Sequence, residues 1–401
     1  MLFEALTLGL GYNATLVTIG AALLGVAAGV TGTFLFLRKR ALVSDAISHA
    51  TLPGVGLAFI LMVTIGLDGR NLAGLLLGSA VSAGLGLLAV SWLTRHTRLG
   101  EDAAIGSVLS VFFGAGVVLL TVIQTMSSGR QAGLEGFLLG STAGMLFGEA
   151  VLIALGGAAV LALVLLLRRP MTIVAFDPEF AAGAGMNTTR IDLAIMGLVL
   201  AVTVVGLKIV GLILIIALLI IPPVTARFWS DRAGTVALIS GAIGGLSGWV
   251  GTAISATAPD LPTGPIIVLT AFAIFILSML CAPGRGVLSS LVRYLAFQRR
   301  VHLRQGLLAI AQGQPVYEPL TLRLLTRAGL AHADGVATDA GRARAAKALR
   351  DEARWGVVRR HDAFAGTAAL YDGLREIETV LTADQIAEVD TLLGGPKEAA
   401  T

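Results

Sequence analysis

Two long apolar runs joined by a basic turn decide the fold: ATLVTIGAALLGVAAGVTGTFLFL (residues 14–37), RKR (38–40) and ALVSDAISHATLPGVGLAFILMVTIGL (41–67). Each run has the roughly 20 apolar residues that a helix needs to cross the hydrocarbon of a bilayer. The three cations lie where a short loop at a membrane surface would place them. The stretch therefore predicts two transmembrane helices joined by a basic loop.

Most of the chain continues in the same composition. Of its 401 residues, 56% are hydrophobic and only 13% are charged; 50 are glycine, and the mean hydropathy is +0.86. A soluble domain has about 45–50% apolar and about 25% charged residues. The composition therefore excludes a soluble globular enzyme and a disordered chain, and we expect an all-α polytopic membrane protein.

Charge divides the chain into two expected domains. Residues 1–284 carry 25 charged residues, whereas the much shorter segment 285–401 carries 29. We therefore expect a transmembrane domain over 1–284 and a small cytoplasmic domain over 285–401. The one cysteine, Cys281, excludes an intrachain disulfide and a cysteine-based metal cluster.

Nine segments are apolar enough to be transmembrane helices. They are 14–37, 41–67, 72–93, 103–126, 149–167, 191–206, 209–226, 233–258 and 262–282. Only Lys208 interrupts the apolar stretch 191–226, so the boundary between the sixth and seventh segments is the least defined. Residues 133–148 are apolar but short, which favours a re-entrant or surface segment.

Clusters of arginine and lysine indicate the orientation. They lie at 38–40, at 95 and 98, at 168, 169 and 190, at 227 and 232, and at 285 and 293. With nine spans all five clusters fall on one side, which the positive-inside rule makes the cytoplasm. We therefore expect the N-terminus outside and the C-terminal domain in the cytoplasm.

Two ionisable residues lie inside the second predicted span. Asp45 and His49 are one helical turn apart and share a helix face. An ionised carboxylate at this depth costs at least about 2.5–3.5 kcal/mol, so a cation, water or a partner helix must offset it. Carboxylate plus imidazole, without a thiolate, is a ligand set for a divalent first-row transition metal.

Neighbouring groups could extend such a site. Ser44, Ser48 and Thr51 place hydroxyls nearby, and Pro53 leaves the carbonyl of His49 without its helical donor. The pair could instead relay protons, or satisfy itself and hold helices together. Spacing alone leaves these three interpretations open.

At these residues the sequence resembles the manganese/zinc (ABC-3) permeases of metal ABC importers. The signature match is SDAISHA at 44–50 followed by LPGV at 52–55. Two further segments agree in order, namely KIVG at 208–211 with ALLIIPPVTA at 217–226, and DLPTGP at 260–265. The family commonly has a single proline followed by alanine where this chain has two successive prolines at 222 and 223.

The resemblance covers about residues 10–285 and implies a fold of the vitamin-B12-permease type. It implies a homodimer or heterodimer of permeases, an ATP-binding cassette ATPase subunit and an extracytoplasmic metal-binding protein. It also implies that Asp45 and His49 coordinate the transported ion. The sequence itself has no Walker A pattern, so we expect ATP to act on the partner subunit and this chain to be no enzyme and to hold no permanent cofactor.

The loop 168–190 contains the candidate docking element for that ATPase, FDPEFAAGAG at 176–185. Asp177 is expected to cap a short helix that begins at Pro178, and small residues would let a partner approach closely. The segment also resembles the family's coupling helix; the alternative is a solvated loop. The predicted docking residues are Asp177, Pro178, Glu179, Phe180, Ala181 and Gly185.

The C-terminal segment has helical patterning. Helices are expected at 303–312 and 320–328, a hairpin-like wing at 329–337, a basic helix at 338–350 capped by Thr338 or Asp339, and a further helical unit at 378–388. This order resembles the winged-helix regulators of the diphtheria-toxin-repressor type. A full helix-turn-helix needs two helices before the wing, one of which enters the major groove, and here one is shortened or missing. Nucleic acid is therefore not an expected partner, and a regulatory or dimerising module is favoured.

Other residues of this segment bear on its partners. The histidines at 302, 332 and 361 lack carboxylates at i+3 or i+4, which argues against metal sensing. Arg299, Arg300 and Arg304 follow the last span, where they are expected to meet anionic lipid headgroups.

Three functional hypotheses follow. The leading one is the permease subunit of an ATP-driven importer of divalent metal in a bacterial inner or plasma membrane, working by alternating access. Manganese is favoured because the tail resembles a manganese/iron regulator, and zinc and iron are alternatives. The other two are a secondary metal–proton symporter and a membrane-tethered DNA-binding regulator.

Overall fold

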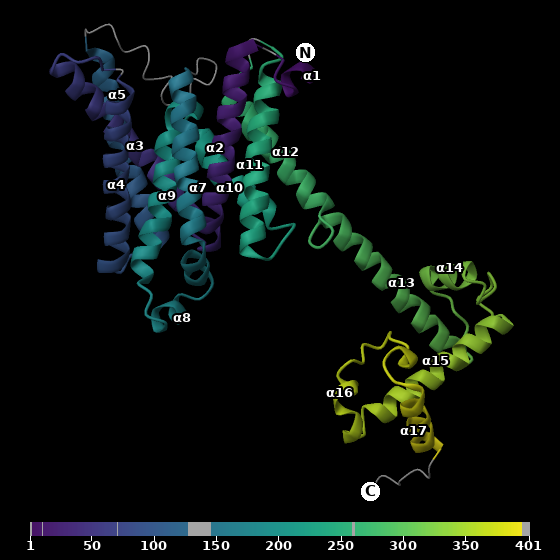
Figure 1. Ribbon diagram of the computed structural model, residues 1–401. Coiled ribbons are helices and arrows are strands. Elements are labelled where there is room, and N and C mark those ends of the chain that lie inside the picture. The colour runs from purple at the N-terminus through teal and green to yellow at the C-terminus, as the bar shows by residue number, and fades with distance from the viewer. Residues whose placement is uncertain (1, 10, 70, 127–145, 259–260, 395–401) are drawn as a thin grey trace. The chain divides into compact units, whose positions relative to one another are not determined.

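The computed structural model describes residues 2–9, 11–69, 71–126, 146–258 and 261–394 (Figure 1). Most of the predicted segment 133–148, and Asp260 of the DLPTGP motif, lie outside these residues. The described residues divide by their contacts into two compact units, Met1–Ser289 and Ser290–Thr401, so the division falls within a helix.

The first unit is made of helices. They are α1 (Leu2–Leu6), α2 (Gly11–Leu37), α3 (Leu42–Thr64), α4 (Leu72–His96), α5 (Glu101–Thr125), α7 (Phe147–Phe176), α8 (Pro178–Gly183), α9 (Thr188–Val210), α10 (Leu212–Ala226), α11 (Ala233–Ser255) and α12 (Thr263–Cys281). Within the described ranges, eight of them are long and apolar enough to cross a membrane.

The predicted span 209–226 differs from the other eight. It is the 15-residue helix α10, which is shorter than a helix needs to cross the hydrocarbon by itself. The chain breaks at Gly211, whose φ of 78° is a left-handed conformation that glycine adopts at little cost, and not at Lys208. Helix α10 packs against the end of α9, where a Cβ atom on Gly206 would lie 2.8 Å from Cδ1 of Ile215.

Helix α7 also departs from expectation. It continues to Phe176, through Arg168, Arg169 and Pro170, although the predicted span ended at residue 167. Two cations followed by proline are typical of a helix end, yet this helix accommodates the proline. Residues 168–176 are therefore helix rather than loop.

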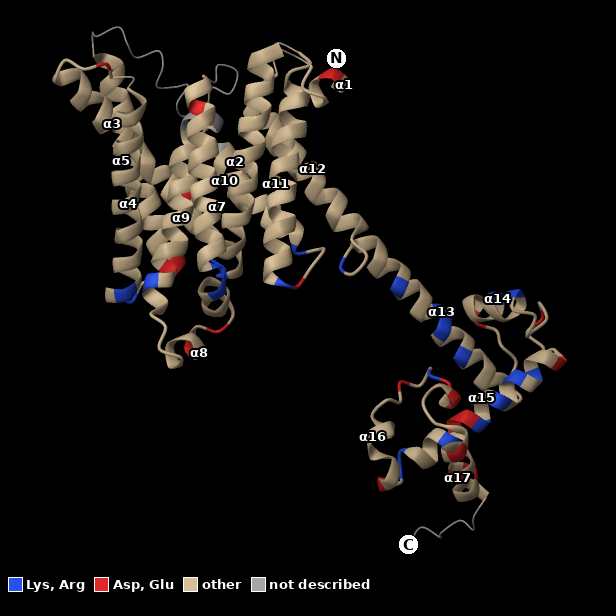
Figure 2. Ribbon diagram, in the orientation of Figure 1, with Lys and Arg blue, Asp and Glu red and all other residues tan. Residues whose placement is uncertain are grey.

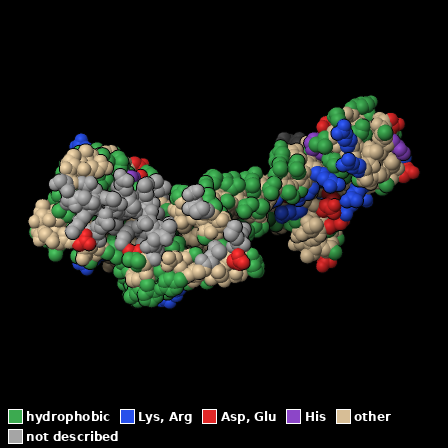
Figure 3. All heavy atoms as spheres, turned by 90° about the horizontal axis from the view of Figure 1, so that it is seen from above, with side chains coloured by type: hydrophobic (Ala, Val, Ile, Leu, Met, Phe, Trp, Pro, Cys, Tyr) green, Lys and Arg blue, Asp and Glu red, His purple; other side chains and the backbone are tan. Residues whose placement is uncertain are grey.

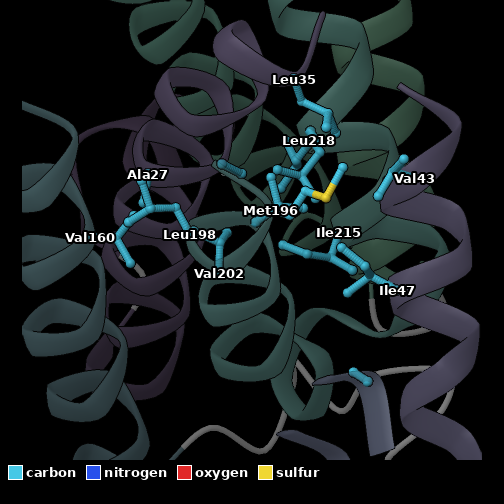
Figure 4. Close-up of a cluster of buried hydrophobic side chains, with 14 of the residues drawn as sticks. Ala27, Leu35, Val43, Ile47, Val160, Met196, Leu198, Val202, Ile215 and Leu218 are labelled. Carbon is cyan, nitrogen blue, oxygen red and sulfur yellow. The ribbon is translucent and has the colours of Figure 1, made fainter. Parts of the chain in front are cut away.

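Most of the long helices of the membrane unit fall into two groups, and α12 packs on α10 and α11 of the second group. Helices α3, α4 and α5 pack on one another, α2 packs on α7, α10 and α11, and α9 contacts both groups. Val43 and Ile47 of α3 lie beside Ile215 and Leu218 of α10 in the main core (Figure 4). This apolar seam positions α3 against the second group of helices.

The second unit is also helical. Its elements are α13 (Val287–Ala311, which begins in the first unit), α14 (Pro319–Arg327), α15 (Asp339–Val358), η3 (Asp362–Phe364), α16 (Ala365–Ala368), η4 (Ile377–Thr379) and α17 (Ala383–Gly394). The helix expected at 303–312 is the end of the longer α13. Thr338 caps α15, its side chain accepting a hydrogen bond from the N–H of Gly341 at 3.0 Å. Between α14 and α15 an antiparallel bridge joins Ala331 to Ala337, at the place of the expected wing.

Ion pairs hold the second unit together. Arg354 donates to both carboxylate oxygens of Asp390, which ties α15 to α17, and this guanidinium lowers the pKa of Asp390. Arg304, with only 12% of its side chain exposed, lies 3.2 Å from Glu352. The expectation that Arg304 meets lipid headgroups is therefore wrong, because tertiary packing turns it into the core of this unit.

Candidate metal site in the membrane unit

Helix α3 positions the Asp45–His49 pair. Asp45 lies in the first turn of α3, where the partial positive charge of the helix N-terminus favours a carboxylate. One turn later the Nε2 atom of His49 lies 3.3 Å from Oδ1 of Asp45. The two side chains therefore share a helix face, as their spacing predicts.

The surroundings of His49 leave one ring nitrogen unused. Its ring meets the ring of Phe113 on α5 edge to face, with centroids 5.0 Å apart. The Nδ1 atom is buried and has no hydrogen-bond partner among the described residues. A buried polar atom without a partner costs about 1–3 kcal/mol, so a ligand or water at this nitrogen would stabilise the site.

The pair lies on the side of α3 away from the apolar seam. Asp45 comes two positions after Val43, and His49 comes two positions after Ile47, and both of these apolar residues belong to the seam. Two positions are about 200° around a helix, so the pair points away from the seam. The side chain of Asp45 is 36% exposed and that of His49 is 22% exposed. In the single chain the pair is thus partly open, facing α5 rather than the α9–α10 core.

The hydroxyls expected to extend the site lie elsewhere. Ser44, Ser48 and Thr51 are fully buried. Ser44 donates to the carbonyl of Ala41 at 2.7 Å, and Thr51 donates to that of Ser48 at 2.6 Å. Because these three residues follow another face of the helix, they do not join Asp45 and His49 as ligands in this structure.

The described ranges contain no group of three or more His, Cys, Asp or Glu residues that could hold a metal ion. The pair therefore offers one carboxylate and one imidazole. A coordination shell for a divalent transition metal has four or more ligands. Further ligands must come from water, from another copy of the chain, or from parts of the chain not described.

A charged network lies at the basic end of the membrane unit, where Figure 2 shows its lysines and arginines gathered. Arg38 donates to Asp192 at 2.8 Å and to the carbonyl of Val174 at 2.8 Å. Arg40 lies 2.7 Å from Glu101 and 3.4 Å from Asp192. These contacts tie the α2–α3 turn to α5, α7 and α9, beside a small cavity of about 70 Å³.

Sequence reasoning missed the role of Asp192. It lies one residue after the expected start of the span 191–206. This acidic residue at the basic side of the membrane could have indicated an ion pair with one of the arginines there. No signal in the sequence pointed to Phe113, which only folding brings to His49.

We expect Asp192→Asn to lower stability by about 3 kcal/mol, because it leaves the largely buried guanidinium of Arg38 without its counter-ion. Asp231→Asn is the matched control at the same end of the unit. Asp231 is 66% exposed where it pairs with Arg227 and Arg285, so its loss should cost no more than about 1 kcal/mol. Thermal unfolding of the purified variants measures both, and equal shifts would contradict the prediction.

The candidate docking element forms a short helix at the same end (Figures 1 and 2). Pro178 is the first residue of α8, and Oδ1 of Asp177 accepts a hydrogen bond from the N–H of Phe180 at 2.8 Å. Glu179 and Phe180 are exposed, Phe180 by 63%. Gly185 turns the chain with a φ of 81°. Ala181 is fully buried, so it packs α8 onto its own chain and is not a surface for a partner.

The model of the ABC 3 transport family matches residues 12–282. The chain belongs to the ABC 3 transport family. The match covers the membrane unit from α2 to α12 and includes the helix that carries Asp45 and His49. Membership does not favour the two other hypotheses, a metal–proton symporter and a tethered DNA-binding regulator.

Relatives of this ABC 3 chain include two bacterial transport proteins. The manganese transport system membrane protein MntC of Bacillus subtilis is 40% identical over 310 residues, 77% of this chain and 70% of that protein. The zinc transport system membrane protein TroC of Treponema pallidum is 37% identical over 294 residues, 73% of this chain and 96% of that protein. The similarity to MntC is longer than the family match and therefore continues past residue 282.

A solved structure has the same architecture. PsaBC from Streptococcus pneumoniae, in complex with Fab, is similar with a TM-score of 0.62 and 29% identity, covering 74% of this chain and 100% of that one. The fold expected from the sequence, an all-α polytopic permease, is therefore confirmed for the membrane unit.

Proposed function

We propose that this chain is the membrane permease subunit of an ATP-driven importer of divalent transition-metal ions. The observation that carries the proposal is the Asp45–His49 pair, held 3.3 Å apart on one face of a membrane-spanning helix in a chain of the ABC 3 family. The names of MntC and TroC, manganese and zinc transport proteins, support a metal ion as the cargo. Manganese is favoured, with zinc or iron as alternatives.

Asp45 and His49 bind the ion in transit. One carboxylate and one imidazole without a thiolate suit Mn²⁺, Fe²⁺ or Zn²⁺. A second permease copy, in a homodimer or a heterodimer, would face the partly open side of α3 and supply further ligands. Because ligands from two chains separate when the chains rotate, such a site can release its ion at modest cost.

The basic end of the unit faces the cytoplasm. The positive-inside rule then places the N-terminus outside, and both α8 and the C-terminal domain inside. This orientation in a bacterial inner or plasma membrane lets an extracytoplasmic metal-binding protein deliver the ion to the opposite end. The C-terminal domain serves regulation or dimerisation, and nucleic acid is not an expected partner.

Helix α8 receives the ATP-binding cassette subunit. Its N-terminal turn is capped by Asp177 and presents the exposed ring of Phe180 beside Glu179. The buried Ala181 fixes the helix to the unit, so that motion of the ATPase is transmitted to α7 and α9, which α8 contacts. ATP hydrolysis on that subunit then drives alternating access.

Phe180→Ala is expected to weaken association with the ATPase subunit by roughly 2 kcal/mol, about thirtyfold, as loss of an aromatic anchor typically does. The fold should be unchanged, because the ring is 63% exposed. Phe147→Ala is the matched control: Phe147 is also 63% exposed but lies at the other end of α7. Titration of the permease with the ATPase subunit measures both, and equal affinities for the two variants would reject α8 as the docking element.

Uptake of Mn²⁺, Zn²⁺ and Fe²⁺ by the complex reconstituted in vesicles tests the function. We expect accumulation that requires both ATP and the ATPase subunit, with Mn²⁺ transported best. Accumulation driven by a proton gradient without the ATPase subunit would reject the proposal in favour of a symporter.

A further inference from the structure

One arginine at the basic end of the membrane unit lies between two carboxylates. Arg40 belongs to the turn between α2 and α3, and its Nε atom lies 2.7 Å from Oε1 of Glu101. Its Nη1 atom lies 3.4 Å from Oδ2 of Asp192. Glu101 is the first residue of α5, and Asp192 lies near the start of α9. Because α9 packs on α3 and α4, Arg40 links the basic end of α5 to the rest of the unit.

The two carboxylates are held with different strength. Asp192 is 13% exposed and accepts a hydrogen bond from Arg38, which also donates to the carbonyl of Val174. Glu101 is 31% exposed. Ion pairs between exposed side chains, of which the second unit carries many on its surface (Figure 3), are screened by water and contribute little. The contact of Arg40 with Glu101 is therefore the end of the network that can open.

The structure offers the guanidinium of Arg40 a second place. Oδ1 of Asp192 is buried and has no hydrogen-bond partner within the described ranges. Asp192 also lines a cavity of about 70 Å³, together with Arg40, Glu101 and Arg95 of α4. Because an arginine can bind both oxygens of one carboxylate, Arg40 can leave Glu101 and give Oδ1 its missing donor. The released Glu101 then lies at the N-terminus of α5, where the helix dipole favours a carboxylate.

Apolar side chains also hold the basic end of α5. Ala104, Ile105 and Val108 are buried there. Apolar contacts are non-directional, so they allow a small shift of the helix more readily than an ion pair does. Farther along, a Cβ atom on Gly116 would lie 2.5 Å from Cβ of Leu52, so α5 lies tightly against α3 at that point. This close contact is a fixed point about which the basic end of α5 can move.

Between these two ends, α5 passes the Asp45–His49 pair. The ring of Phe113 meets the ring of His49 with centroids 5.0 Å apart, and Asp45 lies one helical turn nearer the basic end of α3. A shift of α5 at its basic end therefore changes the wall of the candidate metal site.

We propose that Arg40 is a latch that exchanges carboxylate partners. Bound to Glu101, it holds the basic end of α5 against the α2–α3 turn. Bound by Asp192 alone, it lets that end move away and opens the side of the Asp45–His49 pair that faces α5. Only the consequence for the ion, a path from the pair toward the cytoplasm, rests on the proposed function.

Nitroxide labels on α5 and α9 measure the state of the latch. The full chain with Cys281→Ser carries them through Ala103→Cys and Thr189→Cys, diluted with unlabelled chain in vesicles, and pulsed electron spin resonance gives their separation. We expect Glu101→Gln to lengthen the mean separation by about 2 Å or more, the scale of helix shifts in protein switches. Asp102→Asn is the matched control, because it removes the exposed carboxylate that follows Glu101 on α5, and it should leave the separation unchanged.

Thermal unfolding of the same chain without labels tests the exchange of partners. When Asp192 is present, Glu101→Gln leaves Arg40 one carboxylate, so the melting temperature should fall little. In the Asp192→Asn background neither carboxylate remains, and Glu101→Gln should lower the melting temperature at least about twice as much.

Two results would overturn the proposal. Equal decreases of the melting temperature in the two backgrounds would show that Arg40 does not exchange partners. Equal label separations for Glu101→Gln and Asp102→Asn would show that the ion pair does not hold α5. Neither measurement needs a metal ion or ATP, so the latch can fail while the proposed transport function stands, and the transport function can fail while the latch stands.

Discussion

Asp45→Ala and His49→Ala are each expected to abolish metal uptake by the assembled transporter while its assembly with the ATPase subunit is unchanged. Removing a residue that only hydrogen-bonds to a metal ligand lowers metal affinity or activity about 10–100-fold. Removing one of two residues that bind the metal directly should therefore lower uptake by more than this. Both side chains are partly exposed and lie away from the apolar seam, so neither change removes core packing.

Uptake of the favoured metal, with binding of the ATPase subunit measured in parallel, checks this prediction. Asp45→Asn keeps the volume but removes the charge and should also be inactive. His96→Ala is the matched control, since His96 lies at the end of α4 and stacks on Trp92 away from the pair; it should transport normally. Transport at the wild-type level by both alanine variants would reject the ligand assignment.

The second large effect concerns the contact between α2 and α11. A Cβ atom on Gly244 would lie 2.1 Å from the carbonyl oxygen of Gly25, and one on Gly25 would lie 2.2 Å from that of Gly244. Next to them the hydroxyl of Ser240 donates to the carbonyl of Gly29 at 2.7 Å. Because the obstacle is backbone rather than a flexible side chain, Gly244→Ala must push the helices apart, and we expect a loss of stability of about 3 kcal/mol.

Gly84→Ala is the control for this substitution. Gly84 lies in the interior of α4, and a Cβ atom there would meet nothing within 4 Å. Alanine is the better helix former by about 1 kcal/mol, so this variant should be as stable as the wild type or slightly more so. Thermal unfolding in one detergent compares the two, and similar midpoints would show that the α2–α11 contact is looser than the structure has it.

The Asp45–His49 face and the cap of α8 could be predicted because they depend on neighbours in sequence. The i, i+4 spacing alone brings two side chains to one face, and Asp177 followed by Pro178 is a local helix start. The ends of α7 and α9 could not be predicted in this way. Helix α7 passes Pro170, and α9 passes Lys208, because contacts with other helices outweigh local preference.

The sequence by itself determined that the first part of the chain forms apolar helices long enough to span a membrane, with their basic turns at one end, because hydrocarbon thickness and charge act on each segment separately. Only the tertiary structure decided which neighbours each side chain has. In the folded chain Ser44 and Ala181 are buried, and Arg38 pairs with Asp192. Arg304 pairs with Glu352 inside the second unit, and Asp45 and His49 are partly exposed. These outcomes depend on residues far apart in the chain, whose approach is set by helix packing and not by any local pattern.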